Sequence, residues 1–131
     1  MKWLILTTAL VAMLSAGCNA KLNSVSTFTI PDGDQTAKIL SVPPRPAGQT
    51  IHLDLTSDQP VDLYIMLITK ETTGIEAMSP DEWKKKSLRS FSGITNEKSN
   101  WDIPANNGLT VIVTPAAKTT KATATVKLTN G

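Results

Sequence analysis

The chain has 131 residues, of which 40% are hydrophobic and 18% charged. Its 13 lysines and arginines nearly balance 11 aspartates and glutamates, for a formal net charge of +2. This balance argues against a nucleic-acid partner, because neutralising a phosphate backbone needs an excess of basic side chains. The length is that of one domain after a short leader. The only cysteine, Cys18, leaves no pair for an internal disulfide.

The amino terminus has the pattern of a secretory signal peptide over residues 1–17. Lys2 supplies a positive charge, and an apolar run interrupted by two threonines extends from Trp3 to Leu14. The run is too short for a bilayer-spanning helix, which needs roughly twenty apolar residues. A serine, an alanine and a glycine then lead directly to Cys18.

The segment Ser15-Ala16-Gly17-Cys18 resembles the lipobox of bacterial lipoproteins, although that family more often has leucine where this chain has the serine. The resemblance implies cleavage just before Cys18, attachment of a diacylglyceryl group to its sulfur, and acylation of the new amino terminus. Two or more acyl chains would anchor the protein stably in a membrane. Two alternatives stay open: an ordinary secreted protein cleaved after Ala20, and a retained membrane helix.

These features predict three parts: a lipoprotein signal peptide at 1–17, a lipidated amino terminus with a short tether at 18–24, and a domain at 25–131. They also predict a location in the bacterial cell envelope, where palmitate-like chains on Cys18 make the membrane a partner. By resemblance to the sorting rules of enterobacteria, Asn19 after the cysteine favours the outer membrane if the source has two membranes.

The remaining chain mostly has the alternation of β-strands. The predicted strands cover 27–30, 37–42, 50–56, 61–69, 109–114 and 122–129. Residues 61–69 are apolar on both faces, which predicts a central strand covered on both sides. Turn signals separate the strands, including one at 57–60. This pattern is typical of an all-β fold, an antiparallel β-sandwich.

One segment, residues 70–100, interrupts this pattern between two strands. Within it, Ser79 and Glu82 have the spacing of a capping box, and Pro80 suits the first helical position. They predict one short inserted helix at about 79–87, with lysines near its negative carboxyl end. The rest of the segment is predicted to be irregular.

Two stretches of the chain suggest a family. "VDLYIMLITKE" and, after the predicted helix, "SNWDIPANNGLTVIVTPAAKTTKATATVKL" resemble bacterial β-sandwich domains of the pre-peptidase C-terminal and GOLD-like type. The similarity covers residues 48–129. It implies a sandwich used for stabilisation or binding, and it carries over no functional residue.

The residues that could do chemistry are few. His52 and Asp54 share the polar face of one predicted strand, and a His–Asp pair can orient a general base. No nucleophile motif accompanies them, so a solvated strand face is the better interpretation. One histidine and a lipidated cysteine cannot fill a zinc site, and the acidic turn at 32–34 lacks the ligands of a calcium loop. We predict no enzyme, no metal and no cofactor.

The inserted segment carries the only basic cluster and an adjacent tryptophan. Lysines at the end of a helix are usually solvated, but they can also contact anionic lipids. A tryptophan there either anchors a partner or packs onto the sheet beneath it. The predicted partner-binding residues are Trp83, Lys84, Lys85, Lys86 and Arg89.

Together these observations predict a lipid-anchored cell-envelope lipoprotein. Its β-sandwich would be a non-catalytic binding or assembly module that contacts another envelope protein. The alternative is a small envelope hydrolase or a small-molecule carrier. A carrier needs an apolar cavity, and the domain has few aromatic residues with which to line one.

Overall fold

In the computed structural model, the described residues are 4–9, 22–31, 35–117 and 120–130. Cys18 and the acidic turn at 32–34 lie outside them. The strands are β1 (Leu4–Ala9), β2 (Asn23–Ile30), β3 (Gln35–Val42), β4 (Gln49–Ile68), β5 (Arg89–Ile103), β6 (Gly108–Pro115) and β7 (Ala122–Asn130). A short 3₁₀ helix, η2 (Ile75–Ala77), and one α-helix, α1 (Pro80–Lys86), lie between β4 and β5.

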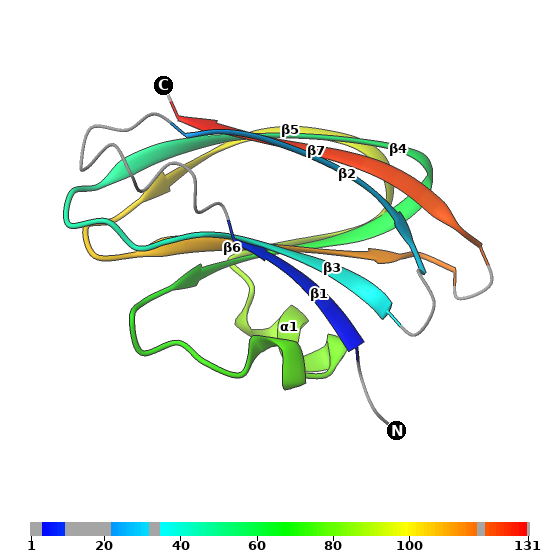
Figure 1. Cartoon of the computed structure of the whole chain (residues 1–131), viewed down its shortest axis with the longest axis horizontal. Coiled ribbons are helices and arrows are strands. Elements are labelled where there is room, and N and C mark those ends of the chain that lie inside the picture. Colours follow the sequence, from blue (N-terminus) through cyan, green and yellow to red (C-terminus); the bar gives the residue numbers. More distant parts are fainter. Residues whose placement is uncertain (1–3, 10–21, 32–34, 118–119, 131) are drawn as a thin grey trace.

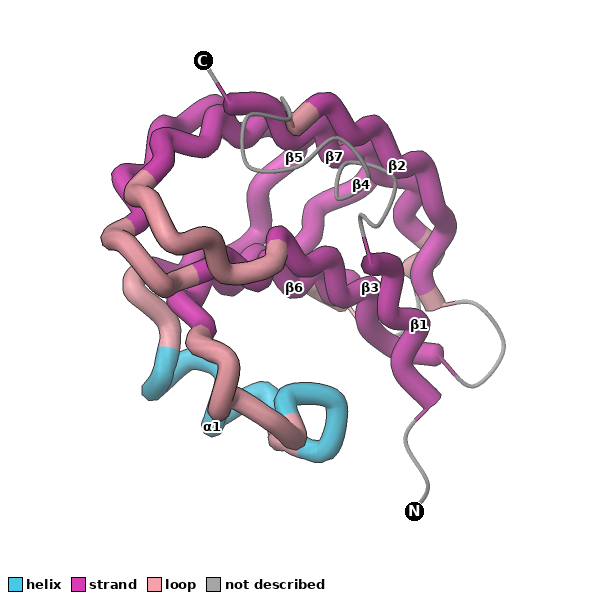
Figure 2. Tube along the Cα trace, turned by 60° about the vertical axis from the view of Figure 1, so that its left-hand side comes forward, coloured by secondary structure: helices cyan, strands magenta, loops and turns pink. Residues whose placement is uncertain are grey.

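The strands form two layers that share β4 and β5 (Figure 1). The upper layer has the order β5-β4-β7-β2, and the lower layer has the order β5-β4-β6-β3-β1. All pairs are antiparallel except β1, which runs parallel to β3. Figure 2 shows how the long strands curl from one layer into the other. The predicted all-β sandwich with one short helix is confirmed.

β4 corrects one prediction, because residues 57–60 do not end a strand. The first half of β4 pairs with β7, and the second half pairs with β6. The ladder to β5 is irregular between Thr56 and Val61, where Pro60 has no N–H to donate. Asp58 Oδ1 instead accepts the Thr123 N–H at 2.7 Å. The turn signal therefore marks the bend at which one strand passes between the layers.

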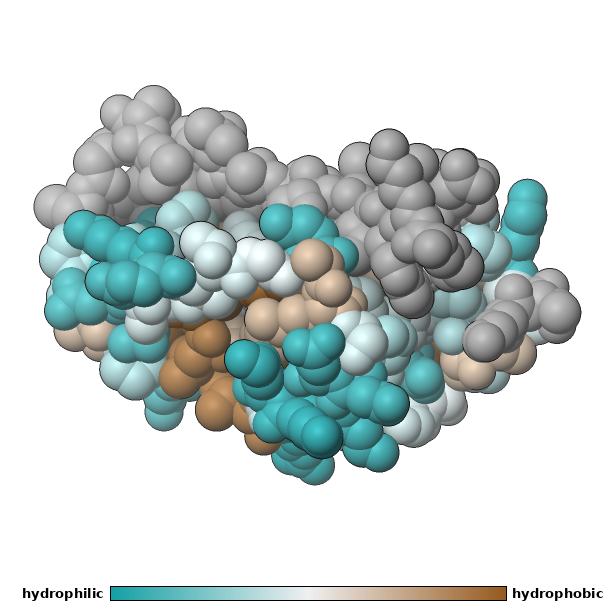
Figure 3. Space-filling view, turned by 90° about the horizontal axis from the view of Figure 1, so that it is seen from below, coloured by the Kyte–Doolittle hydropathy of each residue, from teal (hydrophilic) through white to brown (hydrophobic). Residues whose placement is uncertain are grey.

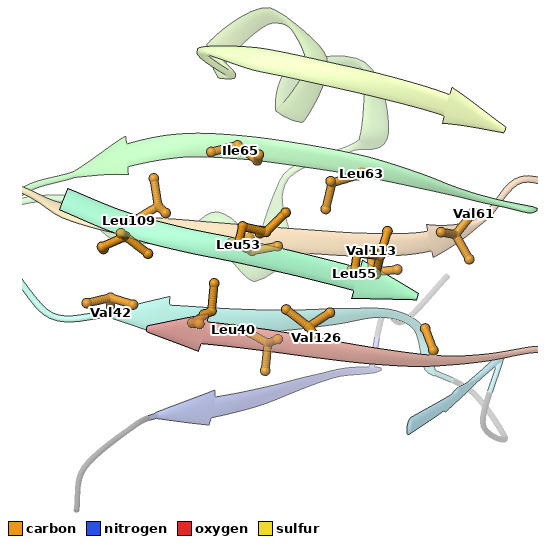
Figure 4. Close-up of a cluster of buried hydrophobic side chains, with 14 of the residues drawn as sticks. Leu40, Val42, Leu53, Leu55, Val61, Leu63, Ile65, Leu109, Val113 and Val126 are labelled. Carbon is orange, nitrogen blue, oxygen red and sulfur yellow. The ribbon is translucent and has the colours of Figure 1, made fainter. Parts of the chain in front are cut away.

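The main core fills the space between the layers (Figure 4). Alternate residues of β4 supply much of it: Leu53, Leu55, Leu63 and Ile65 are all buried. Strands on both layers complete it with aliphatic side chains from β3, β6 and β7. The second half of β4 lies between β5 and β6 and is buried on both faces, so the predicted central strand is confirmed.

A second core lies beneath the lower layer, where α1 covers the sheet (Figure 1). Trp83 is 0% exposed, and its ring centroid lies 5.9 Å from that of Tyr64. Trp83 Nε1 donates to the Ile75 carbonyl oxygen at 2.9 Å. The predicted capping box is present, since Ser79 Oγ accepts from Glu82 N–H and Glu82 Oε1 accepts from Ser79 N–H. The helix is therefore a fixed cover.

The inserted segment is more regular than predicted, because residues 89–103 form one long strand that pairs with β4. The domain also begins earlier than residue 25. Leu22 is buried, and its N–H donates to Asn130 Oδ1 at 2.7 Å. Residues 22–24, predicted to be part of a tether, therefore belong to the folded domain. Neither helix of the described chain is long and apolar enough to cross a membrane.

Candidate functional site

The first half of β4 separates apolar from polar side chains by simple alternation. Ile51, Leu53 and Leu55 point into the main core, and each is at most 2% exposed. His52 and Asp54 lie on the opposite face and are half-buried. The predicted solvated strand face is confirmed, and it is the outer face of the upper layer.

The neighbouring strands turn this face into a groove. In the ladders, His52 lies opposite Asn100 of β5 and Thr129 of β7. Two residues along β4, Asp54 lies opposite a lysine on each side. The groove has a volume of about 290 Å³ and is lined by His52, Leu53, Asp54, Lys98, Ser99, Asn100, Lys127 and Thr129.

A hydrogen bond holds the histidine at one end of this groove. His52 Nδ1 and Asn100 Oδ1 are bonded partners. Because an amide oxygen can only accept, Nδ1 is the donor, and Nε2 is left as the acceptor of the neutral ring. The imidazole therefore has a fixed orientation and can accept a hydrogen bond through Nε2 from a bound group.

Charges alternate in sign across the other end of the groove. Asp54 lies between Lys98 on β5 and Lys127 on β7. Both lysines are exposed, and the three groups carry two positive charges and one negative charge. Opposite charges that face each other across a ladder attract, and the register places Asp54 opposite both lysines. The excess positive charge favours a partner with a carboxylate or another anion.

The rest of the outer face is polar, with one apolar exception. Threonine hydroxyls bond in pairs across β2 and β7, at 2.9 Å for Thr27 and Thr125 and at 3.0 Å for Thr29 and Thr123. Val25 is 61% exposed and lies opposite Lys127 in the ladder. A single exposed apolar side chain is normal on a protein surface.

The predicted partner-binding residues lie elsewhere. Trp83 is buried, which corrects its assignment as a partner contact. It packs in the second core between α1 and the sheet, where a large aromatic side chain buries more apolar area than it would on the surface. Lys84, Lys85 and Lys86 are exposed on the helix. Figure 3 shows that hydrophilic groups on this lower face gather beside a hydrophobic patch. Arg89 Cζ lies 4.9 Å from the Phe91 ring centroid. These four cations belong to the lower layer and do not line the groove.

Lys98, Asn100, Lys127 and Thr129 were missed as candidates from the sequence. Alternation in 122–129 places Lys127 and Thr129 on a polar face, but no local signal pairs that strand with His52. Lys98 and Asn100 lie in a segment that we predicted to be irregular, although its polar residues do alternate along the strand. Only the strand pairing brings the four residues to one place.

The described residues contain no group of three or more His, Cys, Asp and Glu side chains that could hold a metal ion. Ser99 lies opposite Leu53 in the ladder, and its Oγ accepts the Trp101 Nε1–H at 2.8 Å. The groove has hydrogen-bonding and charged groups arranged for binding.

No protein-family model and no curated protein match the chain. Solved structures do match it. The periplasmic inhibitor of g-type lysozyme from Aeromonas hydrophila has 11% sequence identity and a TM-score of 0.59 over 99% of this chain and 100% of its own. The pre-peptidase C-terminal domain of collagenase from Bacillus anthracis has 8% identity and a TM-score of 0.55 over 98% of this chain and 97% of its own. At such identities the likeness shows the β-sandwich fold alone.

Proposed function

We propose that the protein is a lipid-anchored cell-envelope lipoprotein whose β-sandwich is a non-catalytic module that binds another envelope protein through the His52 groove. The observation that carries the binding role is the groove itself: polar and charged side chains from three strands meet on one exposed face. One structural neighbour supports a binding role, because its description is that of a periplasmic inhibitor of g-type lysozyme.

The anchor rests on the sequence at residues 15–18, with the outer membrane as the destination if the source has two membranes. Metabolic labelling with a palmitate analogue should mark the protein, and Cys18→Ala should abolish the label. A mature amino terminus at Lys21 would contradict lipidation and would indicate an ordinary secreted protein.

The groove is tested by charge reversal and crosslinking in intact envelopes. Lys98→Glu with Lys127→Glu should abolish the crosslinked partner, because the surface then repels an anionic group. The matched control reverses two exposed charges on the other layer, Lys84→Glu with Lys85→Glu, and should leave the crosslink intact. The opposite pattern would move the site to the predicted cluster on α1 and β5.

The α1 lysines and Arg89 remain a second proposed contact, with anionic lipid head groups. Each charge near such a surface contributes about 1 kcal/mol. Charge reversal at Lys84, Lys85 and Lys86 should then weaken binding to anionic vesicles, with neutral vesicles as the control. Unchanged vesicle binding would show that these lysines do not contact lipid and are simply solvated at the end of the helix.

A narrower candidate for the partner is a lysozyme, because one structural neighbour is an inhibitor of g-type lysozyme. Glycosidases act through carboxylates in a cleft, and the groove offers an excess of positive charge to such groups. Purified domain should then reduce the lytic activity of a g-type lysozyme, and the Lys98→Glu, Lys127→Glu variant should not. Full lytic activity at a large molar excess of the domain would exclude this partner.

A further inference from the structure

The lower layer has a strand whose edge is covered by a part of the chain predicted to be removed. β3 pairs with β6 on one side and with β1 on the other. β1, Leu4–Ala9, lies within the predicted signal peptide at 1–17. Cleavage before Cys18 would therefore leave β3 as the edge of the lower layer, with one side of its backbone unpaired.

We propose that this edge is a docking site for an extended, uncharged strand donated by a protein partner, which pairs in parallel with β3. The inference rests on the proposed maturation before Cys18. The observation that carries it is the occupant seen in the whole chain: the segment LILTTA is uncharged, and four consecutive residues, 6–9, pair in register with 38–41.

β3 is suited to this role because both of its faces are already covered. Leu40 and Val42 face the main core, and Ala37 and Ile39 face the second core beneath α1. Each is at most 1% exposed in the whole chain, where β1 is in place. A partner strand therefore meets a rigid backbone edge, and its side chains can extend the two cores. Backbone hydrogen bonds supply affinity in this mode of recognition, and side-chain pockets supply specificity.

Features at the two ends of the strand restrict the occupant. Pro43 and Pro44 follow β3 directly and end its ladder. Lys38 lies on the same strand face as Leu40, with its Nζ 5.7 Å from the Phe28 ring centroid on β2. A buried cation at the edge disfavours indiscriminate pairing and disfavours a cationic partner residue beside it. The ladder is thus short and selective for a strand without basic residues.

The test compares two forms of the purified protein by hydrogen exchange. One is the full chain carrying Cys18→Ala, and the other is residues 19–131 with no lipid. The shorter form contains every described side chain of both cores, since these come from residues 22–128. We expect backbone amides within 38–41 to exchange at least about tenfold faster in the shorter form, while β6 and the other open edge, β2, stay unchanged.

A peptide with the sequence of residues 4–9, acetylated and amidated so that it is uncharged, should then restore the protection of 38–41. Two matched controls separate strand addition from apolar adhesion: a scrambled peptide, and peptides with N-methyl groups on either the odd or the even amides. One N-methyl series should lose all effect and the other should retain it, because only alternate amides of a strand face its neighbour.

Several outcomes would overturn the proposal. Equal protection of 38–41 in both forms would show that the edge is not opened by maturation. Loss of a cooperative melt in residues 19–131 would make β1 an obligatory part of the fold. Restoration by the scrambled peptide would indicate adhesion alone. These results concern unlipidated protein, so they leave the palmitate labelling and the groove crosslinking to succeed or fail separately.

Discussion

At the scale of single residues, Trp83 and Gly108 are each constrained by close packing against specific neighbours. Trp83 joins α1 to the lower layer through the Tyr64 ring and through the Ile75 carbonyl. Gly108 begins β6 against the turn that follows β3. A Cβ at this position would lie 2.2 Å from the Val42 carbonyl oxygen and 2.8 Å from the Pro44 nitrogen.

Trp83→Ala should lower the free energy of unfolding by about 3–5 kcal/mol, because it opens a cavity under the sheet. Trp83→Phe keeps most of the ring but loses the Nε1–H donor, so it should cost less. Urea unfolding of the purified domain measures both changes. A cost below about 1 kcal/mol for Trp83→Ala would contradict its burial in the second core.

Gly108→Ala should destabilise the domain by about 1–3 kcal/mol, since backbone atoms of the neighbouring turn must move. Gly48→Ala is the matched control, because there the nearest atom is the Ile103 carbonyl oxygen at 3.1 Å. In thermal melting, the Gly108→Ala variant should have a clearly lower melting temperature than the Gly48→Ala variant. Equal melting temperatures would mean that the turn at residues 42–44 moves to accommodate the added methyl group at little cost.

At the scale of elements, β4 organises the molecule. Its 20 residues serve both layers, pairing with β5, β6 and β7. Alternation predicted both halves as strands and predicted the burial of the second half. The turn signal at 57–60 led to the prediction of two separate strands where the structure has one. A Ser-Asp-x-Pro sequence is compatible with a bend within a long strand as well as with a turn. A bend and a turn differ in the strands with which the flanking residues pair. That pairing joins residues far apart in the chain, so the local sequence does not reveal it.

Ile65→Ala should cost about 2–5 kcal/mol, because Ile65 is fully buried between β5 and β6 in the main core. Thr56→Ala, an exposed position of the same strand, should change stability by less than about 0.5 kcal/mol. Denaturant unfolding compares the two. Similar small costs would place the second half of β4 at the surface.

At the scale of the whole molecule, the sandwich separates its two candidate surfaces. The His52 groove is formed on β4, β5 and β7 of the upper layer. The helix α1, which carries the lysines, lies beneath the lower layer (Figure 1). Leu22, just before β2, has a buried side chain, and its N–H donates to Asn130 Oδ1 near the carboxyl end. This contact ties the start of β2 to the end of β7.

A chain that starts at Asn19 should therefore be more stable than one that starts at Val25, the predicted start of the domain. The longer chain retains Leu22 and the first residues of β2 that pair with β7. Within the longer chain, Leu22→Ala should cost about 2–5 kcal/mol. Calorimetric melting checks both comparisons, and equal melting temperatures for the two chains would restore the boundary at residue 25.

The sequence by itself determined the all-β class, the capped helix and the central strand that buries most of residues 61–66. Each depends on local periodicity or on spacing within one turn, which neighbouring residues encode directly. It also predicts the lipobox at Cys18, a signal that a peptidase reads in an unfolded segment. The apolar/polar alternation at 50–56 likewise predicted that His52 and Asp54 share an exposed face.

Only the tertiary structure decided that Trp83 is core, that β5 is a strand, and that Lys98, Asn100, Lys127 and Thr129 meet around His52 and Asp54. The groove needs antiparallel pairing between segments about 45 to 75 positions apart in the chain, estimated from the ladder partners of β4. Such pairing is set by the burial of whole faces against each other, and a one-residue slip would turn each side chain to the opposite face. No local pattern carries that information.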